Sequence, residues 1–344
     1  MRALIIAGGT LGHIKPSLEI AEVLKKQKDE VIFVTTSKQK GYIENKGFKA
    51  YTLNAPYTKR LASFNTIKFP LKFINSYINS KRLLRKINPD VIISLGSYLS
   101  IPIILNSKKR IPLFLCEQNV LPGKANKFAQ RYARAVFTSF EESKKYFSIP
   151  VYNYGNPLGE EFFKRKKTKN RNFTILIFGG TNGAYDINRV IISKLKELKE
   201  KKINIIHITG DSYFNEVNNY YKNHNIKATI LPFTNNILSY YNKADLVICR
   251  AGSSSLFELS ALEKPSIIIP HPNSKDNHQE LNSNIAKKLG FIVIDPKDIA
   301  NTLIPTIVRI AQKKKTIKIK NNLAKIDSAE NIVNKIYEIL KYGN

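Results

Sequence analysis

One short pattern occurs twice in this chain of 344 residues. Residues 4–12 read LIIAGGTLG, and residues 175–183 read ILIFGGTNG. Each copy is an apolar strand followed by a glycine-rich loop and then by a helical pattern, which is how a doubly wound α/β unit begins. The second copy begins about half a chain after the first. The sequence therefore predicts an α/β protein made of two doubly wound halves.

Further strands are expected from short apolar runs rich in Val, Ile and Leu, which suit parallel sheets covered on both faces. A helix beginning at Pro16 is expected to present Leu18, Ala21 and Leu24 on one face. After the first copy of the pattern, the expected strands lie at 31–34, 91–94, 113–116, 174–178, 203–208, 228–231, 245–249, 266–269 and 291–294.

The two halves are expected to meet in a linker. Residues 149–172 contain prolines, glycines and the basic run from Lys164 to Lys167, all typical of a connection. We therefore expect one domain over 1–155 and a second over 156–327. The last helix, about 328–344, could pack back on the first domain.

The formal net charge of +30 is the most prominent feature of the composition. Such a charge favours polyanionic partners, namely nucleic acid, an anionic membrane surface or phosphorylated substrates. A lysine-rich composition shared by a whole proteome would give the same number. No apolar stretch of about 18 residues occurs, and the N-terminal apolar run leads into a glycine loop, so a strand is expected there rather than a signal peptide. Cys116 and Cys249 are expected to be buried, reduced thiols, which favours the cytosol.

Two loops of the first half are candidates for chemistry, because ligands of open α/β sheets bind at the carboxyl ends of the strands. Residues 8–13 read GGTLGH, so glycines and a helix start could approach an anion, or simply form a tight turn. His13 there is suited to proton transfer, although a histidine can also be a turn residue. Residues 117–123 read EQNVLPG, where Asn119 could bind a ligand or cap a helix.

Three loops of the second half have the same character. Residues 179–184 repeat the first glycine loop, and residues 250–258 read RAGSSSLFE, with small residues that could surround a diphosphate. Glu258 could accept hydrogen bonds from a ribose diol, or could complement the helix dipole. Residues 276–282 form a third polar helix start. The histidines are scattered and no Asp-x-Asp pair follows a strand, so no metal site is expected. A Walker A motif is also absent, which argues against a kinase or NTPase.

Taken together, these motifs resemble one family. The matching segments run in the family's order along nearly the whole chain, and the set is highly specific although no single piece is. They are GGTLGH(x)2P at 8–16, GSYLSIP at 96–102, EQNVLPGKANK at 117–127, GNP at 155–157, GGTNGA at 179–184, CRAGSSSLFE at 249–258 and DNHQELN at 276–282. This set resembles the MurG-type enzymes, which transfer N-acetylglucosamine (GlcNAc) from UDP-GlcNAc to undecaprenyl-diphospho-muramoyl-pentapeptide in peptidoglycan synthesis.

The resemblance implies a GT-B fold, with two Rossmann-like domains and an active site in the cleft between them. It also implies inversion at the anomeric carbon, with no essential metal and no cofactor, and a peripheral protein at the cytoplasmic side of the membrane. His13 would be the catalytic base, and Tyr98, Glu117 and Gln118 would lie near the acceptor. The donor contacts implied by the resemblance are Thr10, Leu11, Gly12, Asn119 (sugar), Thr181 and Asn182 (diphosphate), Thr234 (uracil, through its backbone), Ser253, Ser254, Ser255, Leu256, Phe257, Glu258 (ribose), His278 and Gln279 (sugar hydroxyls).

The chain departs from the family pattern in three places. Leu11 stands where the family usually has Gly, and residues 253–255 are all serine. Gly159 stands where the motif Asn-Pro-x-Arg has its arginine, which removes an expected donor contact; Arg165 or Lys164 could replace it. The rival interpretations are another GT-B transferase acting on a lipid or small molecule, a UDP-sugar epimerase, or a basic nucleic-acid-binding protein. The last would need stacking aromatics or a recognition helix, and the sequence has neither.

Residues 59–86 combine eight basic residues and no acidic one with many apolar side chains. Helices that lie on membrane surfaces are built in this way, although an ordinary packed helix with a solvated basic rim has a similar pattern. The apolar face is expected to include Phe73, Ile74, Tyr77 and Ile78. The predicted membrane patch consists of Lys68, Lys72, Phe73, Tyr77, Lys81, Arg82 and Arg85.

Overall fold

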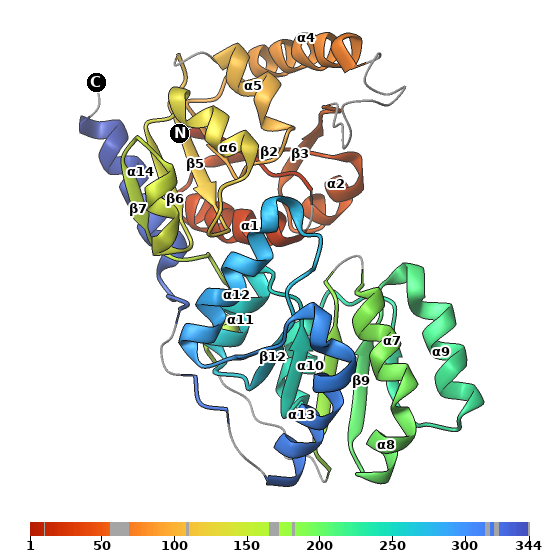
Figure 1. The fold of residues 1–344 in the computed structure, drawn as a ribbon. Coiled ribbons are helices and arrows are strands. Elements are labelled where there is room, and N and C mark those ends of the chain that lie inside the picture. Colours follow the sequence, from red (N-terminus) through yellow and green to blue (C-terminus); the bar gives the residue numbers. More distant parts are fainter. Residues whose placement is uncertain are drawn as a thin grey trace. The chain divides into compact units, whose positions relative to one another are not determined.

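The chain forms two compact units, which are described here one at a time (Figure 1). The computed structural model describes residues 1–9, 11–55, 69–107, 110–164, 172–180, 183–313, 317–319 and 323–342. The first unit comprises Met1–Leu158 and Lys325–Asn344, and the second comprises Gly159–Ala324. Both boundaries between the units lie three residues from the positions expected from the sequence: 158/159 instead of 155/156, and 324/325 instead of 327/328.

The first unit is built on a parallel sheet with the order β3-β2-β1-β4-β5-β6-β7. Helices cover both of its faces. The strands are β1 (Arg2–Ile6), β2 (Glu30–Thr35), β3 (Lys49–Thr52), β4 (Val91–Ser94), β5 (Leu113–Glu117), β6 (Ala135–Thr138) and β7 (Val151–Asn153). The helices are α1 (Leu11–Lys26), α2 (Ser37–Glu44), α4 (Phe69–Ile87), α5 (Ser100–Ser107), α6 (Lys124–Ala129) and α14 (Ser328–Tyr342), with short 3-10 turns at Gln130–Tyr132 and Glu141–Tyr146.

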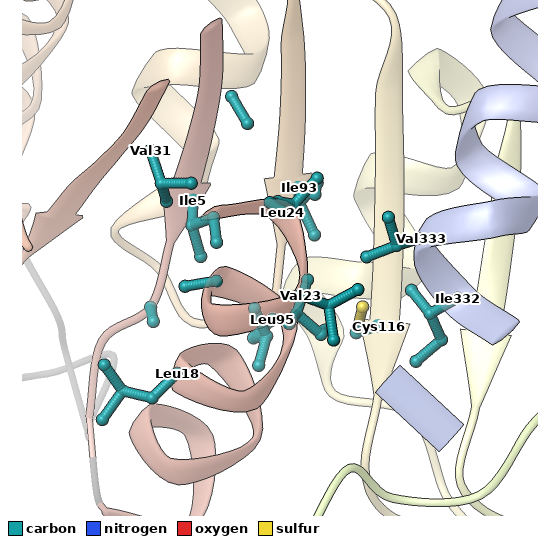
Figure 2. Close-up of a cluster of buried hydrophobic side chains, with 14 of the residues drawn as sticks. Ile5, Leu18, Val23, Leu24, Val31, Ile93, Leu95, Cys116, Ile332 and Val333 are labelled. Atoms are coloured by element: carbon teal, nitrogen blue, oxygen red, sulfur yellow. The ribbon is translucent and has the colours of Figure 1, made fainter. Parts of the chain in front are cut away.

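Alternate residues of β1 show how the sheet divides its two cores. Ile5 packs with residues of α1 and α14, whereas Leu4 packs with residues of α4 and α5 on the other face. Figure 2 shows the first of these cores, where Ile332 and Val333 of α14 lie near Cys116. Both faces are therefore apolar, and polar chemistry is left to the sheet's ends.

The C-terminal helix α14 packs back on the first unit, as the sequence allowed. It contacts α1, and the hydroxyl of Tyr337 donates a hydrogen bond to Asp29. The other carboxylate oxygen of Asp29 lies 2.6 Å from the amino group of Met1. This contact joins both ends of the described chain to the turn before β2.

The second unit has the same sheet topology as the first, apart from one strand fewer. Its parallel sheet has the order β10-β9-β8-β11-β12-β13, which is the same winding as β3-β2-β1-β4-β5-β6. The strands are β8 (Thr174–Phe178), β9 (Asn204–Ile208), β10 (Thr229–Leu231), β11 (Leu246–Cys249), β12 (Ser266–Ile268) and β13 (Ile292–Val293). The helices are α7 (Tyr185–Ser193), α8 (Leu195–Glu200), α9 (Phe214–Asn223), α10 (Ile237–Lys243), α11 (Ser253–Ala261), α12 (His278–Leu289) and α13 (Ile299–Lys313), with short 3-10 turns η3 (Glu160–Phe163), η4 (Asp211–Tyr213), η5 (Lys275–Asn277) and η6 (Pro296–Asp298).

This winding confirms the prediction of two doubly wound α/β halves. In such a sheet the chain order reverses beside the first strand, and loops there diverge to opposite faces and leave room for a ligand. In the first unit the reversal lies between β1 and β4, and in the second it lies between β8 and β11. The repeated glycine loops therefore follow the central strands.

Several expectations were wrong in detail. Helix α1 begins at Leu11, directly after the glycine loop, so Pro16 lies inside the helix and not at its first position. There it removes one internal hydrogen bond, and its ring crowds the carbonyl four residues earlier. Strands β3, β6 and β7 were not predicted, since they are only three or four residues long. Strand β7 lies inside the expected linker, which therefore begins later than residue 149.

A buried histidine lies in the core of the second unit. His207 Nε2 is 3.0 Å from Asn188 Oδ1, and its Nδ1 is 3.2 Å from the Tyr221 hydroxyl. Burial lowers the pKa of His207 to about 3, because a charged imidazolium would lose its hydration there. In the unfolded chain a histidine has a pKa near 6.5, so below that pH folding must remove the proton from His207.

We predict that the second unit loses stability as the pH falls from 6.5 toward 3, by up to about 1.4 kcal/mol per pH unit from His207 alone. Urea unfolding followed by circular dichroism between pH 7 and 4 should show a shallower dependence in His207→Gln. The matched control His224→Gln changes a half-buried histidine of the same unit and should keep the wild-type dependence. Equal pH dependence in wild type and His207→Gln would contradict the prediction.

Candidate functional site

The first glycine loop joins β1 to α1 at the reversal point of the first sheet. Gly9 has a φ of 95°, a conformation that favours glycine. A side chain at Gly8 would place its Cβ 3.0 Å from Ser97 Oγ, so the loop after β4 approaches closely. Leu11 and Gly12 form the first turn of α1, and Thr10 lies outside the described residues.

His13, the third residue of α1, meets a side chain from the next candidate loop. Its Nδ1 lies 2.9 Å from Oε1 of Gln118, a residue only 4% exposed. His13 itself is half-buried. The structure therefore brings together two of the predicted site residues, which are 105 positions apart in the sequence.

Glu117 has a structural role that the sequence did not indicate. Its Oε1 accepts a hydrogen bond from Asn119 N at 3.0 Å, and its Oε2 accepts bonds from Gly123 N at 3.1 Å and from Asn126 Nδ2 at 2.9 Å. The side chain is buried. The carboxylate therefore fixes the segment that carries Gln118 and Asn119. That Glu117 also lies near the acceptor stays a prediction.

The other predicted residues of this unit lie close to the same edge of the sheet. The backbone carbonyl of Asn119 accepts a hydrogen bond from Ser143, and the side chain of Asn119 is half-buried. Tyr98 is half-buried in the loop after β4, directly after Gly96 and Ser97, which both have positive φ. That loop and the loop after β1 flank the reversal point.

In the second unit, α11 begins with the predicted run of serines. Gly252 caps the helix, and Ser253 is buried with an Oγ atom that has no hydrogen-bond partner in the described part of the chain. The first N–H groups of a helix lack internal partners, so Ser253 to Ser255 offer donors to an anion. The side chains of Leu256 and Phe257 are fully buried, so a donor contact of either residue would come from its backbone, and their assignment to the donor stays a prediction.

Glu258, assigned to the ribose, is buried beneath this helix start. Its Oε2 accepts a hydrogen bond at 2.9 Å from the hydroxyl of Tyr241, and the pKa of Tyr241 is raised well above 10 by burial and by Glu258. Tyr241 stays protonated and donates to the carboxylate. The tyrosine was not predicted as part of the site, because it lies in the middle of the short helix α10 and shows no motif.

Arg250 is a second residue whose role the sequence did not reveal. It follows β11, is buried, and forms an ion pair with Asp186 in the first turn of α7. Its Nη1 also donates to the carbonyl of Pro270 at 3.2 Å. Arg250 therefore connects the loops after β8, β11 and β12. The sequence feature that could have indicated Arg250 is a charged residue directly after an apolar strand.

Helix α12 begins with two of the predicted donor contacts, His278 and Gln279. Gln279 Oε1 accepts a hydrogen bond from His271 N at 2.9 Å, so this oxygen is bonded to the loop before the helix. His278 begins the helix, after Asp276 and Asn277, which both have positive φ.

Thr234 follows β10, and its hydroxyl accepts a hydrogen bond from Asn236 N at 3.1 Å. Thr181 and Asn182 lie outside the described residues. So does Arg165, one of the two proposed substitutes for the family arginine. The other, Lys164, is exposed and lies 3.6 Å from Glu160, an ordinary surface pair.

Three further observations concern metals, thiols and membranes. No three His, Cys, Asp or Glu side chains lie close enough to hold a metal within the described residues. Both cysteines are free and buried, as predicted, and burial raises the pKa of the Cys116 thiol to about 12. No helix in the described ranges is long and apolar enough to cross a bilayer.

Comparison with known families identifies both units. Residues 3–138 match the model of the glycosyltransferase family 28 N-terminal domain, and residues 174–336 match that of the family 28 C-terminal domain. A protein of Caldanaerobacter subterraneus subsp. tengcongensis is 34% identical, with 99% of each chain covered, and one of Geobacter metallireducens is 32% identical, with 98% covered. Each is named UDP-N-acetylglucosamine–N-acetylmuramyl-(pentapeptide) pyrophosphoryl-undecaprenol N-acetylglucosamine transferase.

Solved structures share the fold at lower sequence identity. Acinetobacter baumannii MurG aligns with a TM-score of 0.74 at 22% identity, covering 98% of this chain and 99% of the other. A UDP-GlcNAc 2-epimerase from Methanocaldococcus jannaschii aligns with a TM-score of 0.69 at 16% identity, covering 98% and 100%. The same two-unit architecture therefore occurs in a transferase and in an epimerase.

We predict that Glu117→Ala lowers the free energy of unfolding by about 3 kcal/mol, because three donors, one of them the buried amide of Asn126, lose a buried, charged acceptor. Glu141→Ala is the control: it removes an exposed ion pair with Lys144 in the same unit and should change stability by less than about 1 kcal/mol. Urea unfolding measures both. If the two variants are equally stable, Glu117 does not hold its loop.

Proposed function

This chain belongs to the UDP-N-acetylglucosamine–N-acetylmuramyl-(pentapeptide) pyrophosphoryl-undecaprenol N-acetylglucosamine transferases of glycosyltransferase family 28, and we propose that it performs this transfer. The donor would be UDP-GlcNAc and the acceptor the polyprenyl-diphosphate-linked muramoyl-pentapeptide. The observation that carries the proposal is the identity of 34% over 99% of both chains. The epimerase alternative rests on a shared fold alone.

The donor half of the proposal is supported by the carboxyl edge of the second sheet. Three small residues, Ser253 to Ser255, open α11, and the hydroxyl of Ser253 is buried there without a hydrogen-bond partner in the described chain. A diphosphate oxygen at this helix start would accept a hydrogen bond from that hydroxyl. Glu258, held by Tyr241, would accept hydrogen bonds from the ribose hydroxyls.

The acceptor half is supported by the first unit. In the reaction, the acceptor hydroxyl oxygen bonds to the anomeric carbon of GlcNAc while the bond from that carbon to UDP breaks, which inverts the configuration. The hydroxyl proton would pass to His13, and the electron pair of the broken bond would leave with UDP. Proton removal by a positioned base contributes typically 10²–10⁴-fold to a rate.

Charge on the departing UDP would be stabilised by helix-start N–H groups and serine hydroxyls, so that no essential metal or other cofactor is needed at the diphosphate.

Helix α4 supports association with an anionic membrane surface. Three apolar side chains on one face of the helix are exposed, namely Leu71 (71%), Ile74 (53%) and Ile78 (44%). Arg82 and Arg85 extend this face toward the C-terminus at helical spacing and are also exposed. An apolar stripe that continues into basic residues is typical of helices that lie on membranes, and each basic residue contributes about 1 kcal/mol near anionic lipid.

The opposite face of α4 packs on α5. Ser76 and Ser80 are buried, and Asn106 of α5 donates to the carbonyl of Tyr77 at 2.8 Å. Phe73 and Tyr77, which the sequence assigned to the patch, are half-buried, so their part in it stays a prediction. Ile74 and Ile78 of the expected face lie in the exposed stripe. Lys68 lies outside the described residues. We propose a peripheral protein at the cytoplasmic side of the membrane, with no nucleic-acid partner.

We predict that His13→Ala lowers kcat for GlcNAc transfer by about 10²-fold or more and leaves the donor KM near wild type, because a base acts on the transition state. Transfer of radiolabelled GlcNAc to a polyprenyl-diphosphate acceptor measures this. His224→Ala in the second unit is the control. Turnover above half of wild type in His13→Ala would exclude His13 as the base, whereas no transfer by the wild type would contradict the proposed function.

We predict that excess EDTA leaves the initial rate of transfer unchanged, since the diphosphate contacts proposed above contain no metal. The rate should be measured before and after dialysis against the chelator, with and without added Mg²⁺ or Mn²⁺. Loss of transfer with EDTA and recovery with either ion would contradict this prediction.

We predict that the protein binds vesicles of phosphatidylglycerol and phosphatidylcholine, and that binding weakens as salt rises. Replacing the basic residues of α4 with glutamate should abolish sedimentation with these vesicles, whereas transfer to a soluble short-chain acceptor should continue. The four replaced residues are Lys72, Lys81, Arg82 and Arg85.

The matched control carries the same charge change on another exposed surface. It replaces Lys194, Lys196, Lys199 and Lys201, at or beside α8, with glutamate. A third variant replaces Leu71, Ile74 and Ile78 with glutamine and should also bind weakly. If the α4 glutamate variant and the α8 control sediment equally with vesicles, α4 is not the membrane surface.

A further inference from the structure

The contact between Gln118 and His13 constrains where the imidazole carries its proton. A neutral histidine has one protonated ring nitrogen, and its identity is set by the partner of the other nitrogen. The partner of Nδ1 is the amide oxygen Oε1 of Gln118, at 2.9 Å. An amide oxygen can only accept a hydrogen bond. With the amide in this orientation, the proton would lie on Nδ1 and Nε2 would keep its lone pair.

The surroundings hold this contact in place. Gln118 is 4% exposed, and the residue before it, Glu117, fixes the loop through hydrogen bonds to Asn119 N, Gly123 N and Asn126 Nδ2. On the other side, His13 lies in the first turn of α1, where the backbone is helical. Both partners are thus attached to rigid elements of the same unit.

We propose that Gln118 is a positioning residue that holds His13 in the Nδ1–H tautomer and so makes Nε2 the atom that accepts the acceptor's proton. The inference rests on the proposed function for its catalytic meaning, but the tautomer itself does not. Gln118 takes this role instead of the acceptor contact expected from the sequence.

A neutral amide suits this role in a way that a carboxylate would not. A carboxylate beside Nδ1 would stabilise the imidazolium and raise the pKa of the histidine, so that less of the free base would be present at a given pH. An amide fixes the ring and its tautomer without adding a charge. An amide rotated by 180° would instead donate to Nδ1, leave the proton on Nε2 and prevent that atom from acting as a base.

The direct test is the tautomer of His13, read from the ¹⁵N shifts of imidazole nitrogens in the full-length protein labelled with ¹⁵N-histidine. His13→Gln assigns the signal among the five histidines. We expect the proton on Nδ1 in the wild type and a mixture of tautomers in Gln118→Ala. Gln39→Ala is the matched control: this buried glutamine donates to Gly9 O at 3.2 Å but does not contact His13, so the tautomer should stay.

Kinetics supply the second readout. Gln118→Ala should lower kcat about tenfold or more with little change in the donor KM. Gln118→Glu restores an acceptor for Nδ1–H, so it should recover much of kcat and move the acidic limb of the kcat/KM profile to higher pH. A purely structural role predicts neither the recovery nor the shift.

The outcomes separate this inference from the proposed function. A proton on Nε2 in the wild type, or an unchanged tautomer in Gln118→Ala, would overturn the inference even if transfer is observed. Absence of transfer with the expected tautomer would instead overturn the proposed function and leave the positioning of His13 intact.

Discussion

Burial of both faces of a parallel sheet is the constraint on which the rest of this molecule depends. In each unit the central strand is apolar on both sides, so that Leu4 and Ile5 of β1 enter different cores. Helices must then cover both faces, and polar groups can collect only at the ends of the strands. At the reversal point beside each first strand, loops diverge and expose helix starts. The glycine loops and the serine run of α11 occupy these positions for that reason.

Buried polar side chains turn these exposed loops into defined geometry. Glu117 accepts three hydrogen bonds and fixes one loop of the first unit, whereas Arg250 joins three loops of the second through Asp186 and Pro270. Neither residue needs to touch a substrate to matter. An unpaired buried charge is costly, so removing a partner from either network would destabilise the loop that it holds. The side chains that would meet ligands, among them His13 and Ser253, are supported by such networks.

The surface of α4 follows from the same separation of apolar and polar groups. Its small residues Ser76 and Ser80 face α5 and allow the two helices to approach closely, whereas Leu71, Ile74 and Ile78 are left exposed. The exposed stripe is thus a consequence of which side chains the helix uses for packing. Because basic residues continue this stripe, the helix combines an apolar contact with attraction to negative charge.

The sequence by itself determined the winding and the candidate loops, because strand periodicity, glycine loops and the duplicated pattern are local features that one segment displays alone. It also indicated His13, Gln118 and Glu258. Only the tertiary structure decided what these residues do to one another, because a hydrogen bond between positions 13 and 118, or between Tyr241 and Glu258, leaves no local pattern. It likewise showed that Glu117 accepts hydrogen bonds inside its loop and that the side chains of Leu256 and Phe257 lie in the core. Short strands such as β7 became visible only there, since pairing with a neighbouring strand stabilises three residues that have no strong preference of their own.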